Sequence, residues 1–120
     1  MRITKTHFNR FKREFDRYID KLGLNGYRIT YRHEPINGAY ASIHVSEPAK
    51  LAVVTLCTEI DKSDVGEYCT PESHARHEAM HLFLSKISWL AESRYTTENE
   101  INEENERLVR VLEKQMKCEG

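Results

Sequence analysis

The sequence predicts an α+β domain, because stretches with helical and with strand periodicity fall into separate groups along its 120 residues. One amphipathic helical pattern comes first, three short stretches with strand character follow, and two further helical patterns complete the chain. The length is close to the commonest size of one domain, and no linker or internal repeat divides it. We therefore expect a single domain over residues 1–120, with a three-stranded sheet that has antiparallel pairing.

The first helix and the three strands are marked by periodicity and by turn residues. Large apolar side chains recur at helical spacing over residues 4–22, and Gly23 provides a C-terminal stop. Residues 27–33 and 39–45 alternate between apolar and polar side chains, as half-exposed strands do. Residues 51–57, LAVVTLC, are almost continuously apolar. This third strand is therefore expected to be buried on both faces.

Two more helices are expected in the C-terminal half. Pro71 suits the first turn of a helix, which should cover about residues 72–90. Thr97 and Glu100 have the spacing of a capping box, in which each side chain satisfies a backbone N–H of the first turn. The last helix should begin there and end near Lys117.

The amino-acid composition restricts the binding partners and the cellular compartment that we expect for the protein. Lysine and arginine number 18 against 19 acidic residues, so no overall cationic field suggests nucleic acid as the main partner. No apolar run approaches the roughly 20 residues of a membrane span, and the three cysteines form no C-x-x-C pair. We expect a cytoplasmic protein without a membrane partner, and the sequence leaves its oligomeric state open.

The segment HEAMH, residues 77–81, places two histidines and a glutamate on one face of the helix expected over residues 72–90. At 100° per residue, six polar residues of this helix lie within about 60° of one line. They are His77, Glu78, His81, Ser85, Ser88 and Glu92. The opposite side is apolar and is expected to face the core, with Ala79, Met80, Phe83, Leu84, Ile87, Leu90 and Ala91.

This spacing is that of a metal site. Histidines at positions i and i+4 lie one turn apart, so His77 and His81 can bind one ion, for which zinc is the expected metal. Glu78 can then reach a water on that ion and take its proton, as the general base of a hydrolase does. His74 shares the face but lies about 10.5 Å of helix rise from His81, so we interpret it as a residue of the helix start or site rim.

A third ligand is needed, and the last helix offers glutamates for it. The metzincin continuation requires Gly at 84 and His at 87, where this chain has Leu84 and Ile87. The buried stripe of the last helix is expected to contain Ile101, Leu108, Val109, Leu112 and Met116, with Asn105 near its centre. Glu104 borders this stripe and is the expected ligand, and Glu106 is the alternative.

The order helix, three strands, H-E-x-x-H helix and glutamate-bearing helix resembles the gluzincin branch of the zincin metallopeptidases. Within this branch, the chain is similar to small metallopeptidase-like proteins of bacteriophages and prophages. The similarity lies in the segment HEAMHLFLSKISWLAESRY followed by NEENERLVRVLE. The resemblance covers mainly residues 74–113. It implies a zincin-like fold and a peptidase in which Glu78 activates a zinc-bound water, with His77, His81 and a downstream glutamate as ligands.

Three functions stay open. In a peptidase, the substrate would be a peptide or protein lying along the strand of residues 39–45. Its carbonyl could be polarised by one of four side chains, Tyr40, His44, Tyr68 or Tyr95. The alternative is a non-catalytic, zinc-stabilised binding module, whose site Cys57 or Cys69 could close. A nucleic-acid-associated protease like those of the SprT family would rest on the basic first helix alone.

Overall fold

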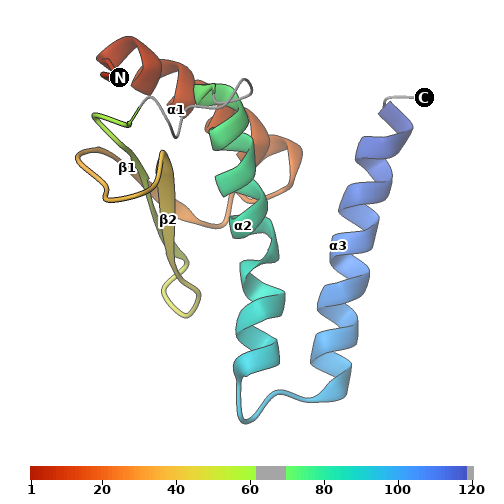
Figure 1. The fold of residues 1–120 in the computed structure, drawn as a ribbon. Coiled ribbons are helices and arrows are strands. Elements are labelled where there is room, and N and C mark those ends of the chain that lie inside the picture. The colour runs from red at the N-terminus through yellow and green to blue at the C-terminus, as the bar shows by residue number, and fades with distance from the viewer. Residues whose placement is uncertain (62–69, 119–120) are drawn as a thin grey trace.

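The computed structural model describes residues 1–61 and 70–118 and has the expected order of elements. Helix α1 (Lys5–Lys21) is followed by three strands, β1 (Arg28–His33), β2 (Ala41–Ser46) and β3 (Leu51–Leu56). Helices α2 (Pro71–Glu92) and α3 (Glu98–Cys118) complete the chain, as Figure 1 shows. The predicted α+β class with three helices and a three-stranded sheet is confirmed.

The sheet is mixed, so the expectation of antiparallel pairing is correct for only one of its two pairs. Its strand order is β1-β3-β2, with β1 parallel and β2 antiparallel to β3. The most apolar strand therefore takes the central position, where both of its edges are paired, and Val54 and Leu56 are fully buried there. Strands β1 and β2, in which apolar and polar residues alternate, form the edges of the sheet, where a polar face can stay exposed to solvent.

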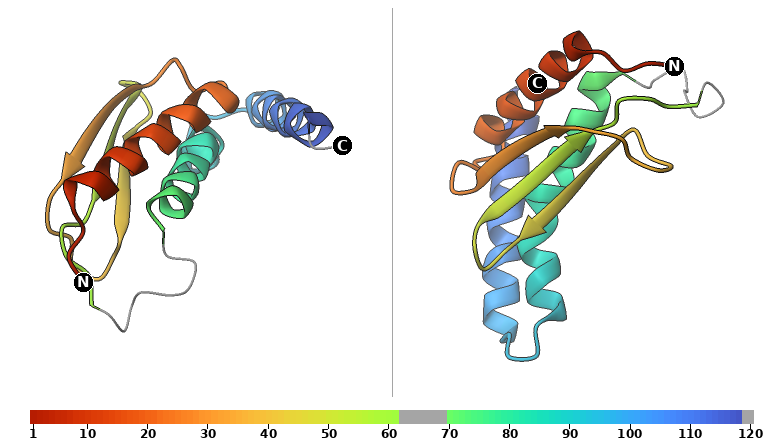
Figure 2. Two further views of the ribbon diagram at one scale, coloured as in Figure 1. Left: turned by 90° about the horizontal axis from the view of Figure 1, so that it is seen from above. Right: turned by 90° about the vertical axis from the view of Figure 1, so that its left-hand side faces the viewer.

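Helices α1 and α2 cover one face of this sheet (Figure 2). Phe11 and Phe15 of α1 and Leu82 and Phe83 of α2 form the centre of the core with Val54. Two crossed ion pairs also join the helices. Arg10 donates to Glu72 at 2.7 and 2.8 Å, and Arg76 donates to Glu14 at 2.6 Å.

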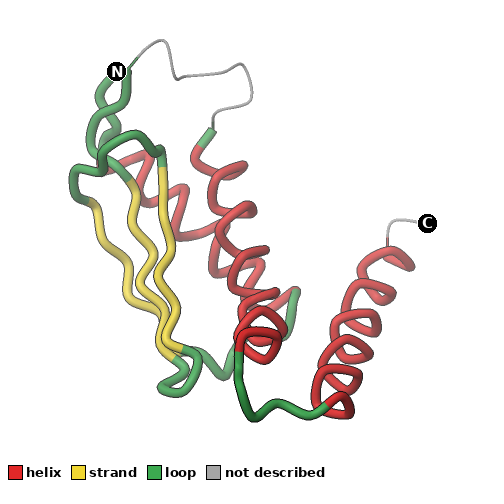
Figure 3. Tube along the Cα trace, turned by 60° about the horizontal axis from the view of Figure 1, so that its bottom comes forward, coloured by secondary structure: helices red, strands yellow, loops and turns green. Residues whose placement is uncertain are grey.

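Helix α3 returns antiparallel to α2, on the side of α2 away from the sheet (Figure 3). The capping box at its start is confirmed, because Glu100 N–H donates to Thr97 Oγ1 at 3.2 Å and Thr97 N–H donates to Glu100 Oε1 at 3.3 Å. No helix in the described part of the chain is long and apolar enough to cross a membrane.

The buried face of α3 differs from the expected stripe. Leu108 is buried as expected, but Val109, Leu112 and Asn105 are exposed. The side chain of Met116 lies outside the described part. The line that meets α2 instead contains Ile101, Glu104, Leu108, Val111 and Gln115. The two stripes are adjacent and share Ile101 and Leu108, and the helical pattern of α3 alone does not say which of them meets a neighbour.

A similar shift affects α2. Ala79, Phe83 and Leu90 of the expected apolar side are buried, whereas Met80 and Leu84 are exposed. The core instead takes Ala75 and Leu82, because α1 and the sheet approach α2 from that side.

Candidate functional site

His77 and His81 project from one face of α2 and bring their rings together. Their Nε2 atoms lie 3.1 Å apart, and the ring planes meet at 82°. Both side chains are exposed. The geometry follows from the helix itself, because residues four apart lie one above the other on one face.

This pair fits a single metal ion. Two Zn–N bonds of about 2.0–2.1 Å at a tetrahedral angle separate the two nitrogen atoms by about 3.3 Å. The observed 3.1 Å is close to that value. Without a metal, the same distance allows one ring N–H to donate to the other ring, and which ring donates depends on the tautomers.

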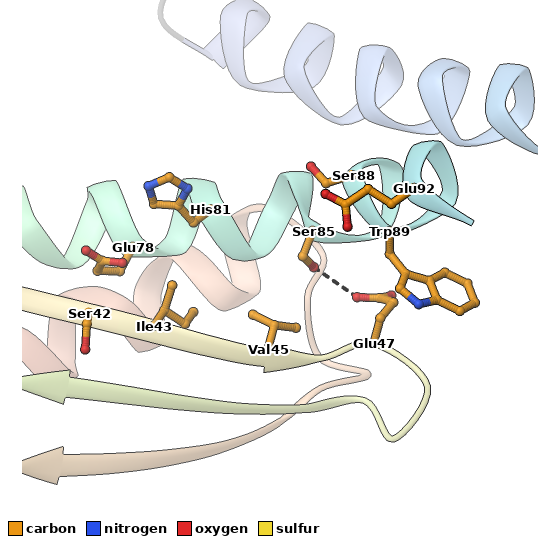
Figure 4. Close-up of a pocket in the computed structure, with 10 residues that line it drawn as sticks. All are labelled: Ser42, Ile43, Val45, Glu47, Glu78, His81, Ser85, Ser88, Trp89 and Glu92. Carbon is orange, nitrogen blue, oxygen red and sulfur yellow. Dashed lines mark hydrogen bonds between the residues drawn. The ribbon is translucent and has the colours of Figure 1, made fainter. Parts of the chain in front are cut away.

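Glu78 follows His77 on α2 and, like His81, lines a groove between α2 and β2; its side chain points toward β2, whereas the ring of His81 points away from it (Figure 4). The side chain of Glu78 is buried, with 7% of its surface exposed. Burial raises the pKa of the Glu78 carboxyl above its ordinary value, and nearby His77 and His81 offset this in part. A carboxylate with a raised pKa holds an abstracted proton better, which suits a general base.

The groove has a volume of about 540 Å³. One wall comes from β2 and the turn after it, with Ser42, Ile43, Val45 and Glu47. The other wall comes from α2, with Glu78, His81, Ser85, Ser88, Trp89 and Glu92. Strand β2 forms an edge of the sheet and pairs only with β3 among the described strands. The groove therefore lies between the predicted catalytic helix and an edge strand.

Glu47 is a buried carboxylate of this groove that no sequence pattern indicates. It accepts hydrogen bonds from the Tyr27 hydroxyl at 2.8 Å and the Ser85 hydroxyl at 3.0 Å, and it pairs with the Lys50 ammonium group. Burial raises the pKa of Glu47, but these three partners outweigh it and lower the pKa below its ordinary value. Because all three partners engage it, Glu47 fixes the end of β2 against α2.

The expected third ligand, Glu104, lies elsewhere. It is buried, accepts a hydrogen bond from Arg107 Nε at 2.8 Å, and lies 3.5 Å from Lys86 Nζ. Glu106 is exposed and lies 3.9 Å from Arg110. Within residues 1–61 and 70–118, no group of three or more His, Cys, Asp or Glu side chains could hold a metal ion. The structure thus brings His77 and His81 together, with Glu78 beside them, and leaves both glutamates of α3 apart.

The candidates for polarising a substrate carbonyl are also dispersed. Tyr40 is buried and stacks on His74, with ring centroids 4.1 Å apart. Tyr95 is 88% exposed in the loop between α2 and α3, and His44 is exposed on β2. None of these lines the groove. Tyr68 lies outside the described residues, as does Cys69.

His74 and Cys57 take structural positions. The stacking on Tyr40 places His74 near the start of β2, where burial, with a smaller contribution from His77, lowers its pKa. Cys57 is fully buried at the end of β3.

A comparison of the chain with protein-family models, curated proteins and solved structures finds no match.

Proposed function

We propose that this protein is a zinc-dependent peptidase in which His77 and His81 supply two of the metal ligands and Glu78 is the general base. The observation that carries the proposal is the 3.1 Å separation of the two Nε2 atoms at one side of a groove that contains the buried Glu78. A zinc ion held there would supply a Lewis acid and lower the pKa of a bound water.

The groove supports a peptide as the substrate. The free edge of β2 offers backbone N–H and C=O groups to an extended chain, which could add to the sheet as a further strand. Ile43 and Val45 line the β2 wall and provide apolar contact for side chains of such a peptide. Glu78 faces this space from the opposite wall, where its carboxylate could receive a proton during hydrolysis.

The proposal makes Glu78→Gln the decisive variant. Zinc content and fold should stay unchanged, because Glu78 is not a proposed ligand. Hydrolysis of a mixture of unfolded peptides should fall by roughly 10²- to 10⁴-fold, the usual contribution of a general base. Glu113→Gln is the matched control, since this exposed carboxylate lies on α3 outside the groove and should be dispensable.

Two outcomes would overturn the proposal that the protein is a peptidase. Zinc-loaded wild-type protein that cleaves no peptide in the mixture would favour the zinc-stabilised binding module. A Glu78→Gln variant that is as active as the wild type would remove the general base. If the variant instead lost its zinc, Glu78 would be a ligand and the assigned roles would be wrong.

A further inference from the structure

Trp89 and Glu92 line one end of the groove between α2 and β2, away from the proposed catalytic residues (Figure 4). They lie three residues apart near the end of α2, so their side chains are neighbours on the surface of the helix. Trp89 is 44% exposed, and Glu92 is exposed as well. We call these two residues the distal pair. Neither belongs to the hydrophobic core, so a molecule in the groove can contact both.

The carboxylate of Glu92 lies in a position that does not favour it. Glu92 is the last residue of α2, at the negative end of the helix dipole, where a carboxylate lowers the stability of the helix. Within residues 1–61 and 70–118 it forms no hydrogen bond and no ion pair that would offset this effect. A cation from another molecule would therefore find a free negative charge at this end of the groove.

The other two carboxylates of the groove already have a role. Glu47 is paired with Lys50 and accepts bonds from two hydroxyls. Glu78 is 7% exposed, points into the groove and accepts no hydrogen bond from the described residues, but a metal on the adjacent histidines would compensate its charge. Among the described residues, no lysine or arginine lines the groove. The negative charge that remains uncompensated is therefore that of Glu92.

An aromatic ring next to a carboxylate favours a cationic side chain. The ring face attracts a lysine ammonium or an arginine guanidinium group, and the carboxylate forms an ion pair with the same group. Figure 4 shows the indole of Trp89 extending from α2 toward the turn that follows β2, where an extended peptide on the edge of β2 would pass. A long cationic side chain of such a peptide could cover the indole and reach Glu92.

The distance between the two ends of the groove determines which residue of a peptide meets the distal pair. Trp89 follows Glu78, and Glu92 follows His81, by eleven residues. This is about 16 Å of helix rise. An extended chain rises about 3.3 Å per residue, so the same distance corresponds to about five residues of a peptide.

We propose that the distal pair binds a lysine or arginine side chain of the substrate peptide, about five residues from the bond that is cleaved. The inference rests on the proposed peptidase function and names the class of peptide that it acts on. An exposed ion pair and a cation–π contact each change affinity about two- to fivefold. A peptide with lysine at this position should therefore bind roughly tenfold more tightly than one with glutamine.

Cleavage of a mixture of unfolded peptides by the zinc-loaded protein tests the preference, because mass spectrometry identifies the residues around every cleaved bond. Lysine and arginine should be enriched about five residues from the bond, on one side of it. Glu92→Gln should abolish the enrichment, and Glu92→Lys should replace it with an enrichment of aspartate and glutamate. Glu113→Lys is the control, because it makes the same change of charge at an exposed position outside the groove. Cleavage without enrichment, or an unchanged pattern in Glu92→Lys, would overturn the inference.

A binding measurement separates this inference from the peptidase itself. The probes are three peptides of about twelve residues, long enough to span the groove, that differ only in a central lysine, glutamine or glutamate. Calorimetry with zinc-loaded Glu78→Gln protein should show roughly tenfold tighter binding of the lysine peptide than of the glutamine peptide. Adding Glu92→Gln should remove the ion-pair part of this difference, and Trp89→Leu the cation–π part.

The two proposals fail in different ways. A preference for the lysine peptide that depends on Glu92, in a protein whose wild type cleaves nothing, would support the distal pair and refute the peptidase. Cleavage by the wild type with equal affinity for the three peptides would support the peptidase and refute the distal pair. Binding of none of the three peptides would also refute the distal pair.

Discussion

Lys86 of α2 and Glu104 of α3 form an ion pair with an Nζ to Oε2 distance of 3.5 Å. Lys86 is nine residues after His77, which places the two side chains about 180° apart around α2. Glu104 therefore meets the side of α2 opposite His77. Its burial beside Arg107 and Lys86 indicates a role in joining the two helices.

We expect Glu104→Gln to lower the free energy of unfolding by about 1–3 kcal/mol, because the buried charge-assisted bonds to Arg107 and Lys86 would be lost. Zinc affinity should not change. Chemical denaturation and a zinc titration of the same variant measure both quantities. Glu106→Gln is the control, since its 3.9 Å pair with Arg110 is exposed. A Glu104→Gln variant of normal stability that binds no zinc would restore Glu104 as the third ligand.

Zinc should raise the thermal stability of the wild type through its two histidine ligands. A ligand at 100 times its dissociation constant stabilises the folded state by about 2.7 kcal/mol, which corresponds to several degrees of melting temperature. His77→Ala and His81→Ala should each abolish this increase. His44→Ala should retain it, because His44 is exposed on β2 outside the groove. Equal stabilisation of all three variants by zinc would place the metal elsewhere.

The helix bearing the proposed site could be predicted from the sequence, whereas the side that each helix turns to its neighbours could not. The 3.1 Å approach of His77 and His81 is local, since a helix brings residues four apart together. The orientation of α3 is not local, because its pattern contains two adjacent packing lines and only the tertiary structure decides between them. Glu104 was expected to border the buried stripe and reach the metal because the pattern indicated one of these lines, whereas the structure uses the other, which contains Glu104.

The burial of Glu47 in the groove could likewise not be predicted from the sequence. Its partners Tyr27 and Ser85 are 20 and 38 residues away, so no short pattern around Glu47 indicates that it is buried. The order of the strands in the sheet could not be predicted from the sequence either. Alternation identified β1 and β2 as half-exposed, but the insertion of β3 between them depends on the core that all three helices and strands share.

Acid should weaken the packing of α1 on α2 through Glu14. Hydrogen bonds from Arg17 and Arg76 lower the pKa of the Glu14 carboxyl below its ordinary value of 4.5. A group whose pKa is lower in the folded state stabilises the fold above its unfolded pKa, and the contribution disappears as the pH falls through the folded value. The stability difference between wild type and Glu14→Gln should thus be constant near neutrality and shrink below about pH 4.5. Denaturant titrations at several pH values measure it, and a difference that grows with acid would contradict the assignment.

Trp89 provides a direct report on the groove, because it is the only tryptophan of the chain, is 44% exposed and lines the groove on the α2 wall. A peptide that adds to the edge of β2 should cover its ring and remove water from it. We therefore expect the fluorescence of zinc-loaded Glu78→Gln protein, which should bind without hydrolysis, to shift to shorter wavelength on addition of the unfolded peptides. Iodide should also quench the emission less. Replacing Val45 with Lys would place a charge in the opposite wall and should reduce both effects, whereas the same change at the exposed Leu51, outside the groove, should not. Peptides that bind, as shown by calorimetry, without altering the emission of Trp89 would place their site outside this groove.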